Sequence, residues 1–361
     1  MAKLFVFVFL ICAYAPVKAQ FVSLSSTEVK TLANAIKTDD KVRAIFEPIK
    51  TTAEKALNDH PNPIEKITSQ GLLAGNPAKT ASLKAVDDAP KIYALALYYR
   101  LYNDKQYLNK ATEYLTAWAK INQPTGDPID GTKLEDLIAG YDLVRDKVNA
   151  QTKADIDAWL DKFASEQINS ESLKSGKLTA INNWNSHRLK VITFIVYTLH
   201  SKKQEQYVND EIEKQIAQNL FVDGSGFDFK QRDALHYHVY TLEPLLKAII
   251  VINRATGKNY YTFQSKSQSS IQQSVQFLMP FITGEKTHIE FLNSTVKFDR
   301  DRAANHEKGY EPANFVPKSG ILVLSLASYF DPSLQEIIKK VNGDNYNDWQ
   351  LVLNKVRTHI K

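Results

Sequence analysis

The fold is decided by the stretch DAPKIYALALYYRLY-ND-KQYLNKATEYLTAWAKI, which runs from Asp88 to Ile121. Apolar side chains recur at helical spacing on both sides of a short polar break, Asn103-Asp104. We expect the two halves to bury the following residues: Ile92, Leu95, Ala96 and Tyr99 in the first, and Tyr107, Ala111, Tyr114, Leu115 and Trp118 in the second. Two helices joined by so short a turn form an antiparallel helical hairpin.

The same organisation is predicted along most of the chain. Helical patterns cover the segments 26–60, 133–148, 152–168, 178–200, 204–220, 233–253, 263–281, 319–329, 332–341 and 347–360. Segments 64–86 and 283–316 read as irregular connections, and no run of alternating strands is visible. Successive hairpins without a repeat of fixed period favour a closed toroid over an open solenoid. We therefore predict an all-α fold, an α/α toroid built as an incomplete barrel of six to seven helical hairpins.

Composition and charge exclude several classes of function. The chain has 361 residues, of which 43% are hydrophobic and 24% charged, as in an ordinary globular protein. The formal net charge is +5, but Lys and Arg form no block or stripe, so we expect no nucleic-acid partner. A mild positive excess is compatible with an acidic polymer as substrate.

The first 19 residues have the features of a secretory signal peptide. Lys3 precedes an apolar run, and Val17 and Ala19 place small residues before a cleavage point after Ala19. No other run is long enough to span a membrane. We expect residues 20–361 to form a single, monomeric α/α-toroid domain that is periplasmic or secreted. The only cysteine, Cys12, lies in the leader, so no disulfide or cysteine metal site is expected after cleavage.

Polar side chains crowd two segments that otherwise read as core helices, 182–188 and 231–240. Asn183 and His187 are four residues apart and share a helix face, as do Arg232, His236 and Tyr240 if their helix extends back to Arg232. Any one of these residues alone is more often a satisfied core side chain. Burying all of them is costly unless a function requires it, so we predict an active site here.

Most hydrolytic chemistries lack their motif. His236 and His238 diverge on a helix, and neither HExxH nor GxSxG is present, so metal and serine hydrolysis are disfavoured. The turn 223–228 lacks the closing glutamate of a calcium loop. Paired carboxylates for glycoside hydrolysis exist, but none stands out by its context: Asp87, Asp88, Asp130, Asp228 and Asp233.

The residue types fit β-elimination on a uronic acid. The enzyme must neutralise the uronate carboxylate so that charge can develop when the C5 proton leaves, a task suited to Asn, His and Arg. A Tyr or His then takes the proton, and a Tyr can protonate the leaving glycosidic oxygen. We expect Arg232 and His236 to lower the pKa of Tyr240. No metal or organic cofactor is required.

These segments resemble the alginate lyase superfamily of toroidal polysaccharide lyases. Residues 87–100 and 107–118 look like its early helical hairpin, Asn182-Asn183 like its Asn-Asn-His motif, and residues 236–240 like its tyrosine-bearing helix. The resemblance implies that Asn183 neutralises the carboxylate and that Tyr240 transfers the proton. Trp184 stands where the family often has His, so His187 is expected to take that role while Trp184 stacks on a sugar ring. Arg232 lies one residue earlier than the family's arginine, whose place Asp233 takes.

The remaining candidates are expected to contact substrate or to close over it. Tyr310 is a further candidate for proton transfer, with Arg300 and Arg302 in the same late segment. The expected substrate contacts are completed by Asn182, Arg188, Tyr237, His238 and Lys84. The polymer, alginate or glucuronan, and the syn or anti course stay open. Two rival functions are a toroidal glycoside hydrolase acting on unsaturated uronides through Asp88 or Asp228, and a glycan-binding protein without catalysis.

Overall fold

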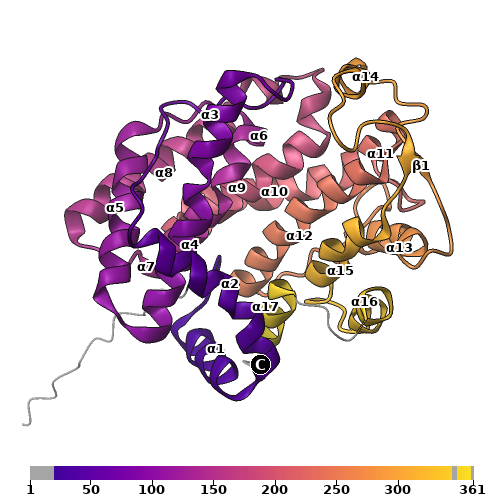
Figure 1. The fold of residues 1–361 in the computed structure, drawn as a ribbon. Coiled ribbons are helices and arrows are strands. Elements are labelled where there is room, and N and C mark those ends of the chain that lie inside the picture. Colours follow the sequence, from indigo (N-terminus) through magenta and orange to yellow (C-terminus); the bar gives the residue numbers. More distant parts are fainter. Residues whose placement is uncertain (1–19, 344–347, 359–361) are drawn as a thin grey trace, which may run out of the picture.

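The fold is described from a computed structural model that covers residues 20–343 and 348–358. The predicted signal peptide, residues 1–19, lies outside the described residues. Helices account for almost all regular structure (Figure 1). Their bounds are α1 Ser26–Thr38, α2 Asp40–Ala56, α3 Pro77–Val86, α4 Asp88–Tyr102, α5 Lys105–Ile121, α6 Pro128–Gly131, α7 Glu135–Val144, α8 Ala150–Ile168, α9 Asn183–Leu199, α10 Lys202–Asn219, α11 Phe227–Arg232, α12 Leu235–Thr256, α13 Ile271–Ile282, α14 Lys297–Ala304, α15 Ile321–Ala327, α16 Leu334–Asn342 and α17 Trp349–Thr358.

Short elements join these helices. Four 3-10 turns are present in the described part of the chain: η1 Thr132–Leu134, η2 Glu171–Leu173, η3 Leu178–Ala180 and η4 Pro317–Gly320. Two-residue strands β1 (Ile289–Glu290) and β2 (Ala313–Asn314) pair antiparallel, with Ile289 opposite Asn314. The predicted all-α class is confirmed.

The hairpin of residues 88–121 forms as predicted. Asn103 takes a left-handed conformation (φ 57°) and its N–H bonds to the carbonyl of Tyr99, which ends α4. Asp104 then caps α5 by accepting a hydrogen bond from the N–H of Gln106. All nine residues expected to be buried in the two helices are buried. A left-handed residue followed by a capping aspartate turns the chain within two residues.

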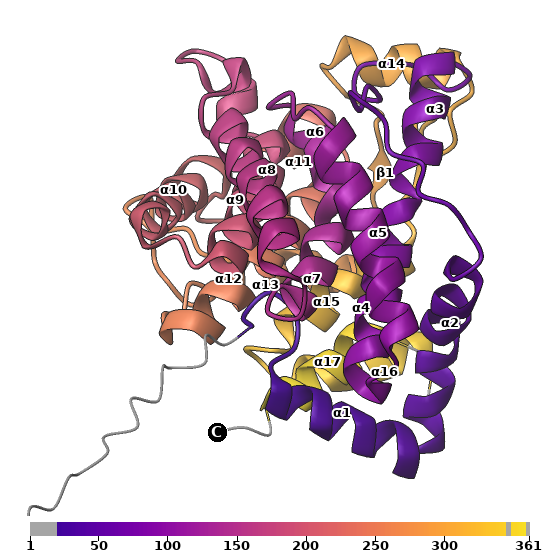
Figure 2. The same ribbon diagram turned by 90° about the vertical axis from the view of Figure 1, so that its left-hand side faces the viewer.

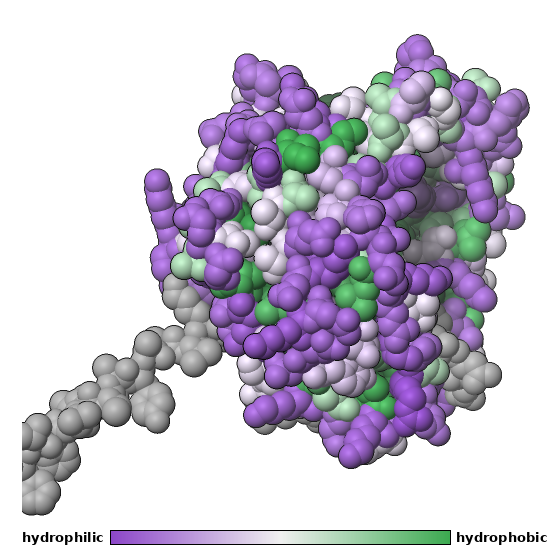
Figure 3. All heavy atoms as spheres, turned by 60° about the vertical axis from the view of Figure 1, so that its left-hand side comes forward, coloured by the Kyte–Doolittle hydropathy of each residue, from purple (hydrophilic) through white to green (hydrophobic). Residues whose placement is uncertain are grey.

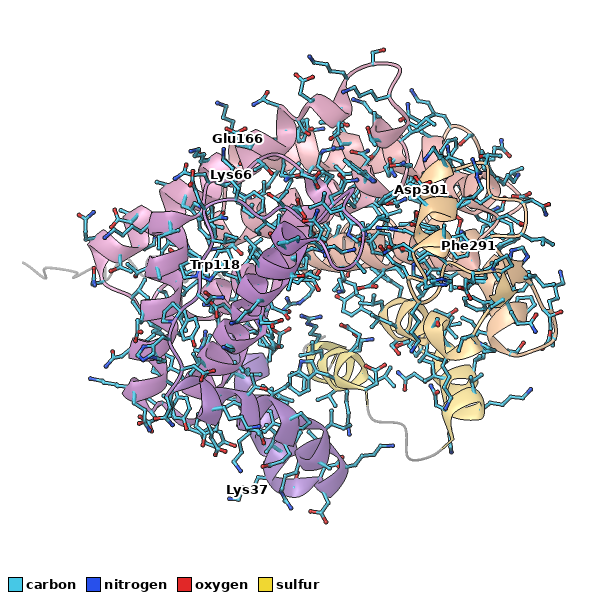
Figure 4. All side chains as sticks on the ribbon, turned by 45° about the horizontal axis from the view of Figure 1, so that its top comes forward. Lys37, Lys66, Trp118, Glu166, Phe291 and Asp301 are labelled. Carbon is cyan, nitrogen blue, oxygen red and sulfur yellow. The ribbon has the colours of Figure 1, made fainter. Side chains whose placement is uncertain are left out.

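The helices form a closed ring with an outer layer. Around the ring, α2 packs on α4, α4 on α7, α7 on α9, α9 on α12, and α12 on α15. Helix α17 contacts α15 on one side and α1 and α2 on the other, so it joins the last part of the ring to the first (Figures 1 and 4). Helices α5, α8, α10, α13 and α16 pack outside this ring on their sequence neighbours. This two-layer arrangement is the predicted α/α toroid.

One glycine permits the close approach of two inner helices. At Gly140 of α7, a Cβ atom would lie 2.9 Å from Ile92 Cγ2 and 3.0 Å from the backbone N of Tyr93, both on α4. Any larger side chain would push α7 away from α4. One hydrophobic cluster runs through the whole ring, from Val22 to Val356. Among the described residues, no helix has the length and apolar character that crossing a membrane would need.

Three segments differ from the prediction. Residues 77–86, expected to be irregular, form α3, because Asn76 caps the first turn through Ala78 N and Lys79 N and Pro77 occupies its start. Residues 297–304, also expected to be irregular, form α14. The helix expected from Asp233 onward begins instead at Leu235, after a separate short helix α11.

The face of the molecule shown in Figure 3 is mostly hydrophilic, with apolar residues in scattered small patches. Helices α3 and α14 lie at the same end of the molecule in two perpendicular views (Figures 1 and 2). That end carries the predicted site.

Candidate active site

A cavity of about 250 Å³ opens at the end of the ring between α3, α9, α12 and α14. Eight of the predicted site residues line it: Asn183, Trp184, Arg232, His236, Tyr237, Tyr240, Arg302 and Tyr310. The rest of the wall is formed by Ser69, Gln70, Lys79, Leu83, Ile129, Lys133 and Phe298. Residues from six α-helices, the 3-10 turn η1 and two loops thus meet in one cavity.

The first turn of α9 places Asn183 at the wall. Asn182 caps the helix by accepting a hydrogen bond from Trp184 N. Asn183, only 1% exposed, donates through Nδ2 to Asp228 Oδ1 at 2.5 Å. An ionised carboxylate only accepts hydrogen bonds, so Asp228 determines which way the Asn183 amide points.

Asp228 is a buried hub that fixes three helices around Asn183. Its Oδ2 accepts hydrogen bonds from Asn219 Nδ2 of α10 and Thr241 Oγ1 of α12, each at 2.9 Å. Burial raises the pKa of Asp228, and the hydrogen bonds from Asn219, Asn183 and Thr241 counteract that rise. The hub connects the carboxylate-binding candidate on α9 to the tyrosine-bearing helix α12.

The break between α11 and α12 separates Arg232 from the row predicted for it. Asp233 has φ 50°, and its carbonyl accepts hydrogen bonds from Phe291 N (2.7 Å) and His288 Nε2 (3.0 Å). Its carboxylate accepts two more from Asn293. These bonds from the β1 region hold the chain out of helical geometry. The expected i, i+4, i+8 face that would begin at Arg232 does not form.

Arg232 nevertheless reaches the cavity from α11. It is paired with Asp299, and its guanidinium lies 3.9 Å from the ring centre of Tyr237. Glu290 Oε1 accepts a hydrogen bond from His236 N at 2.6 Å and so caps α12, whose own N-cap residue Ala234 has no capping side chain.

Tyr240 stands between two imidazoles. The His236 ring is parallel to it, with centroids 6.3 Å apart and an interplanar angle of 7°, and the His187 ring lies 4.1 Å away. Within the described part of the chain the Tyr240 hydroxyl has no hydrogen-bond partner. Burial raises the pKa of Tyr240 well above its ordinary value, with a smaller opposing effect of Arg302. The expected lowering of this pKa is therefore wrong, because burial outweighs the cations.

The two imidazoles differ in access. His236 lines the cavity, and burial together with Arg232 and Arg302 lowers the pKa of its imidazole. His187 is 4% exposed and lies behind Tyr240, with Nδ1 3.0 Å from Thr132 Oγ1. Burial and Lys190 hold the pKa of His187 well below its usual range. Both shifts favour the neutral form of the imidazole.

Arg302 of α14 joins two phenols on the facing wall. Its Nη1 donates to Tyr310 Oη at 2.6 Å and to Tyr237 Oη at 3.2 Å. The guanidinium also lies 4.5 Å from the Tyr310 ring centre. In Figure 4, Phe291, which packs beside Tyr237 and Tyr310, lies on the same side of the molecule as Asp301 of α14.

The two rims of the cavity touch through Glu307. Its carboxylate accepts a hydrogen bond from Ala74 N at 2.6 Å, across the opening from α14. It also lies 3.8 Å from Lys79 Nζ and 3.6 Å from Arg302 Nε. On the other side, Asp130 Oδ1 accepts hydrogen bonds from Ser69 N, Ser69 Oγ and Gln70 N and so fixes the loop before α3.

Six predicted residues do not line the cavity. Lys84 and Arg300 are exposed, and Arg300 donates to the carbonyl of Ser294. Asn182 and His187 have the local roles described above. Arg188 is fully buried and donates to Asn185 Oδ1 and Ser172 Oγ. His238 is fully buried, lies 3.0 Å from the carbonyl of Ser274 through Nε2, and burial lowers its pKa to about 4.

The prediction missed Lys79 and Lys133 among the wall residues. Nothing in the local pattern marks either lysine, because each reaches the cavity only in the folded chain: Lys133 through the packing of η1 on α9, and Lys79 on α3 beside Glu307. The missed residues complete a wall with four cationic side chains, Lys79, Lys133, Arg232 and Arg302, and no carboxylate.

A second cavity, of about 270 Å³, contains none of the predicted site residues. Two of its charged groups, Glu135 and Lys247, lie 2.7 Å apart, and Glu135 is also paired with Lys190. In residues 20–343 and 348–358, no cluster of three or more His, Cys, Asp or Glu side chains is arranged to hold a metal ion.

Comparisons with known proteins identify the family of the chain and relatives of its fold. The family model described as alginate lyase matches residues 31–288. The fold is similar to the crystal structure of an alginate lyase from Bacteroides ovatus, with a TM-score of 0.69, 15% identity, and coverage of 91% of this chain and 97% of that chain. It is also similar to alginate lyase A1-III from Sphingomonas species A1, with a TM-score of 0.57, 18% identity, and coverage of 75% and 80%. A variant of A1-III complexed with a tetrasaccharide gives a TM-score of 0.56 at 18% identity, with coverage of 75% and 80%. None of the curated protein sequences matches the chain.

Proposed function

The chain belongs to the alginate lyase family and is a polysaccharide lyase, and we propose that it cleaves a β-1,4-linked polyuronate, alginate or glucuronan, by β-elimination. The observation that carries this proposal is the charge of the cavity wall, which has four cationic side chains and no carboxylate. A cleft lined by cations attracts a polymer of the opposite sign, although Asp299 and Glu307 behind the wall compensate part of that charge. The names of the structural relatives favour alginate as the first polymer to test.

The proposed reaction begins with neutralisation of the uronate carboxylate. Asn183 donates one Nδ2 hydrogen to Asp228, which leaves its second N–H for the substrate. Such preorganised donors stabilise the negative charge that develops when the C5 proton leaves.

His236 and Tyr240 form the proposed proton-transfer pair. The lowered pKa of His236 leaves a neutral imidazole that can accept the C5 proton. The electron pair of that C–H bond forms the C4–C5 double bond, and the bond from C4 to the glycosidic oxygen breaks. The raised pKa of Tyr240 keeps its phenol protonated, so Tyr240 can donate a proton to the departing oxygen. Trp184 offers a face on which a sugar ring can stack.

We also propose that residues 1–19 are removed as a signal peptide and that residues 20–361 act as one lyase domain in the periplasm or outside the cell. The test is the mass and N-terminal sequence of the protein recovered from an expressing culture. A mature chain starting at Gln20 is expected, and a retained Met1 would contradict it.

The direct test of substrate is a panel of polymers: polymannuronate, polyguluronate, glucuronan and hyaluronan. The absorbance of the conjugated double bond at the new non-reducing end should rise with polymannuronate or glucuronan, whose linkages are β-1,4. A rise with polyguluronate alone, whose linkages are α-1,4, would contradict the proposed linkage. No rise with any polyuronate would refute the proposed substrate class. Loss of absorbance from an already unsaturated oligosaccharide would instead favour the hydrolase alternative.

A further inference from the structure

Within the described part of the chain, one of the four cations in the cavity wall, Lys133, differs from the others in forming no ion pair. Lys79 lies 3.8 Å from Glu307, Arg302 lies 3.6 Å from the same carboxylate, and Arg232 is paired with Asp299. Among the described residues, no carboxylate comes within ion-pair distance of Lys133. An amine without an ion-pair partner is stabilised most by an incoming anion, because its positive charge is not yet compensated.

The acidic residues nearest to Lys133 are already engaged. Asp130 accepts three hydrogen bonds from Ser69 and Gln70. Asp127 caps α6 by accepting hydrogen bonds from Ile129 N and Asp130 N. Burial lowers the pKa of Lys133, and Asp130 and Asp127 only partly oppose that effect. The structure therefore holds an incompletely compensated amine at the wall of an acidic-polymer cleft.

Lys133 is also fixed close to the predicted reaction centre. It follows Thr132, whose Oγ1 lies 3.0 Å from His187 Nδ1. His187 lies one helical turn after Asn183 on α9, and its ring is 4.1 Å from that of Tyr240. The turn that carries Lys133 is thus held against the same wall as Asn183 and Tyr240.

The sequence predicts that His187 replaces the imidazole absent at Trp184. In the structure, however, His187 is buried behind Tyr240. We propose that Lys133 supplies the positive charge that binds and neutralises the carboxylate of the uronate whose C5 proton is removed. Lys133 acts together with the Asn183 amide, and no bond to Lys133 forms or breaks. This role rests on the proposed function and assigns one of its steps to a residue that carries no motif.

The test compares Lys133→Met, which removes the charge but keeps the length, with Lys133→Arg, which keeps the charge. The matched control is Lys120→Met, an exposed lysine on the outer helix α5. Each protein is assayed on the polyuronate that the wild type cleaves fastest and on its methyl ester, in which the carboxylate charge is absent.

For Lys133→Met we expect kcat/KM on the acid polymer to fall by roughly 10²- to 10³-fold. The loss on the methyl ester should be no more than a few-fold, because the ester offers no charge for Lys133 to bind. Lys133→Arg should retain activity within about 10-fold, and Lys120→Met should match the wild type. The melting temperature of each variant shows whether it is folded. If Lys133→Met is unfolded, the test uses Lys133→Arg instead. The ratio of kcat/KM on the acid polymer to kcat/KM on the methyl ester should then stay near that of the wild type for Lys133→Arg.

Two outcomes overturn the inference. The first is that Lys133→Met retains the wild-type kcat/KM on the acid polymer. The second is that its kcat/KM falls equally on the acid polymer and on the ester, which would indicate a structural role. If Lys133→Met does not fold, the inference is overturned when a folded Lys133→Arg protein has a much lower ratio of acid to ester kcat/KM than the wild type. Failure of the proposed function looks different, because the wild type itself would then give no unsaturated product on any polyuronate.

Discussion

Replacing Asp228 by alanine should destabilise the fold and also misplace Asn183. The change removes the acceptor of three buried hydrogen bonds, from Asn183, Asn219 and Thr241, of which Asn219 keeps a second bond to the carbonyl of Ile181. Each buried donor left unsatisfied costs about 1–3 kcal/mol, and a water entering the vacated space recovers part of that. A total of about 3–5 kcal/mol is at the upper end for single substitutions. At about 2 °C per kcal/mol for a large domain, the melting temperature should fall by about 6–10 °C.

The isosteric variant Asp228→Asn separates stability from function. It keeps one acceptor oxygen, so it should cost less stability, but its amide hydrogens now face the Nδ2 group of Asn183. The Asn183 amide must turn over or lose its partner, and kcat should fall by on the order of 10²-fold.

The assay pairs thermal unfolding followed by circular dichroism with turnover well below the melting temperature. Asp142→Asn is the matched control, because Asp142 is also a buried carboxylate, bonded to Ser23 N, and does not line the cavity. Both substitutions should lower stability, and only the one at Asp228 should lower kcat. Normal kcat in a folded Asp228→Asn protein would refute the idea that Asp228 orients Asn183.

Three further predictions concern the ring, the pH dependence and the rims. Gly140→Ala should destabilise by about 1–3 kcal/mol in chemical denaturation, because the new Cβ meets α4 at 2.9 Å, and a gain in stability would contradict the close contact. The pKa of His238 is about 4 in the folded protein and near 6.5 in the unfolded chain, so the unfolded state binds more protons between these values. The free energy of unfolding should therefore fall by about 2–3 kcal/mol as pH drops from 6.5 toward 4. His238→Gln should lose less stability over that range in melting curves, and an equal loss would contradict the role of His238 in the pH dependence. Glu307→Gln should lower KM for the polymer several-fold at low salt, because Lys79 and Arg302 lose a competing carboxylate, whereas an unchanged or higher KM would show that Glu307 does not compete with substrate.

The helical hairpins could be predicted because their signals are local. The α4–α5 turn needs only Asn103 and Asp104, and the buried faces follow from spacing alone. The break between α11 and α12 could not be predicted, because Asp233 is held by residues 288–293, far along the chain. Its surroundings, and not its own residue type, decide its conformation.

The same difference separates the predicted from the missed residues of the site. Asn183, His236 and Tyr240 stand in dense polar segments, so their number and spacing gave a signal. Lys133 is one lysine among many, and only the packing of η1 against α9 brings it to the cavity. The pKa of Tyr240 was mispredicted for a related reason, since burial depends on the whole ring while the charges of neighbours can be read from the helix.

The central claim is that Tyr240 transfers a proton in the cavity between α9, α12 and α14. The most direct test is the rate of double-bond formation by Tyr240→Phe on the best polyuronate, measured beside its melting temperature. Since the hydroxyl has no hydrogen-bond partner in the described part of the chain, the melting temperature should change little, while turnover falls by about 10²- to 10⁴-fold. A folded Tyr240→Phe protein with turnover close to that of the wild type would contradict the account.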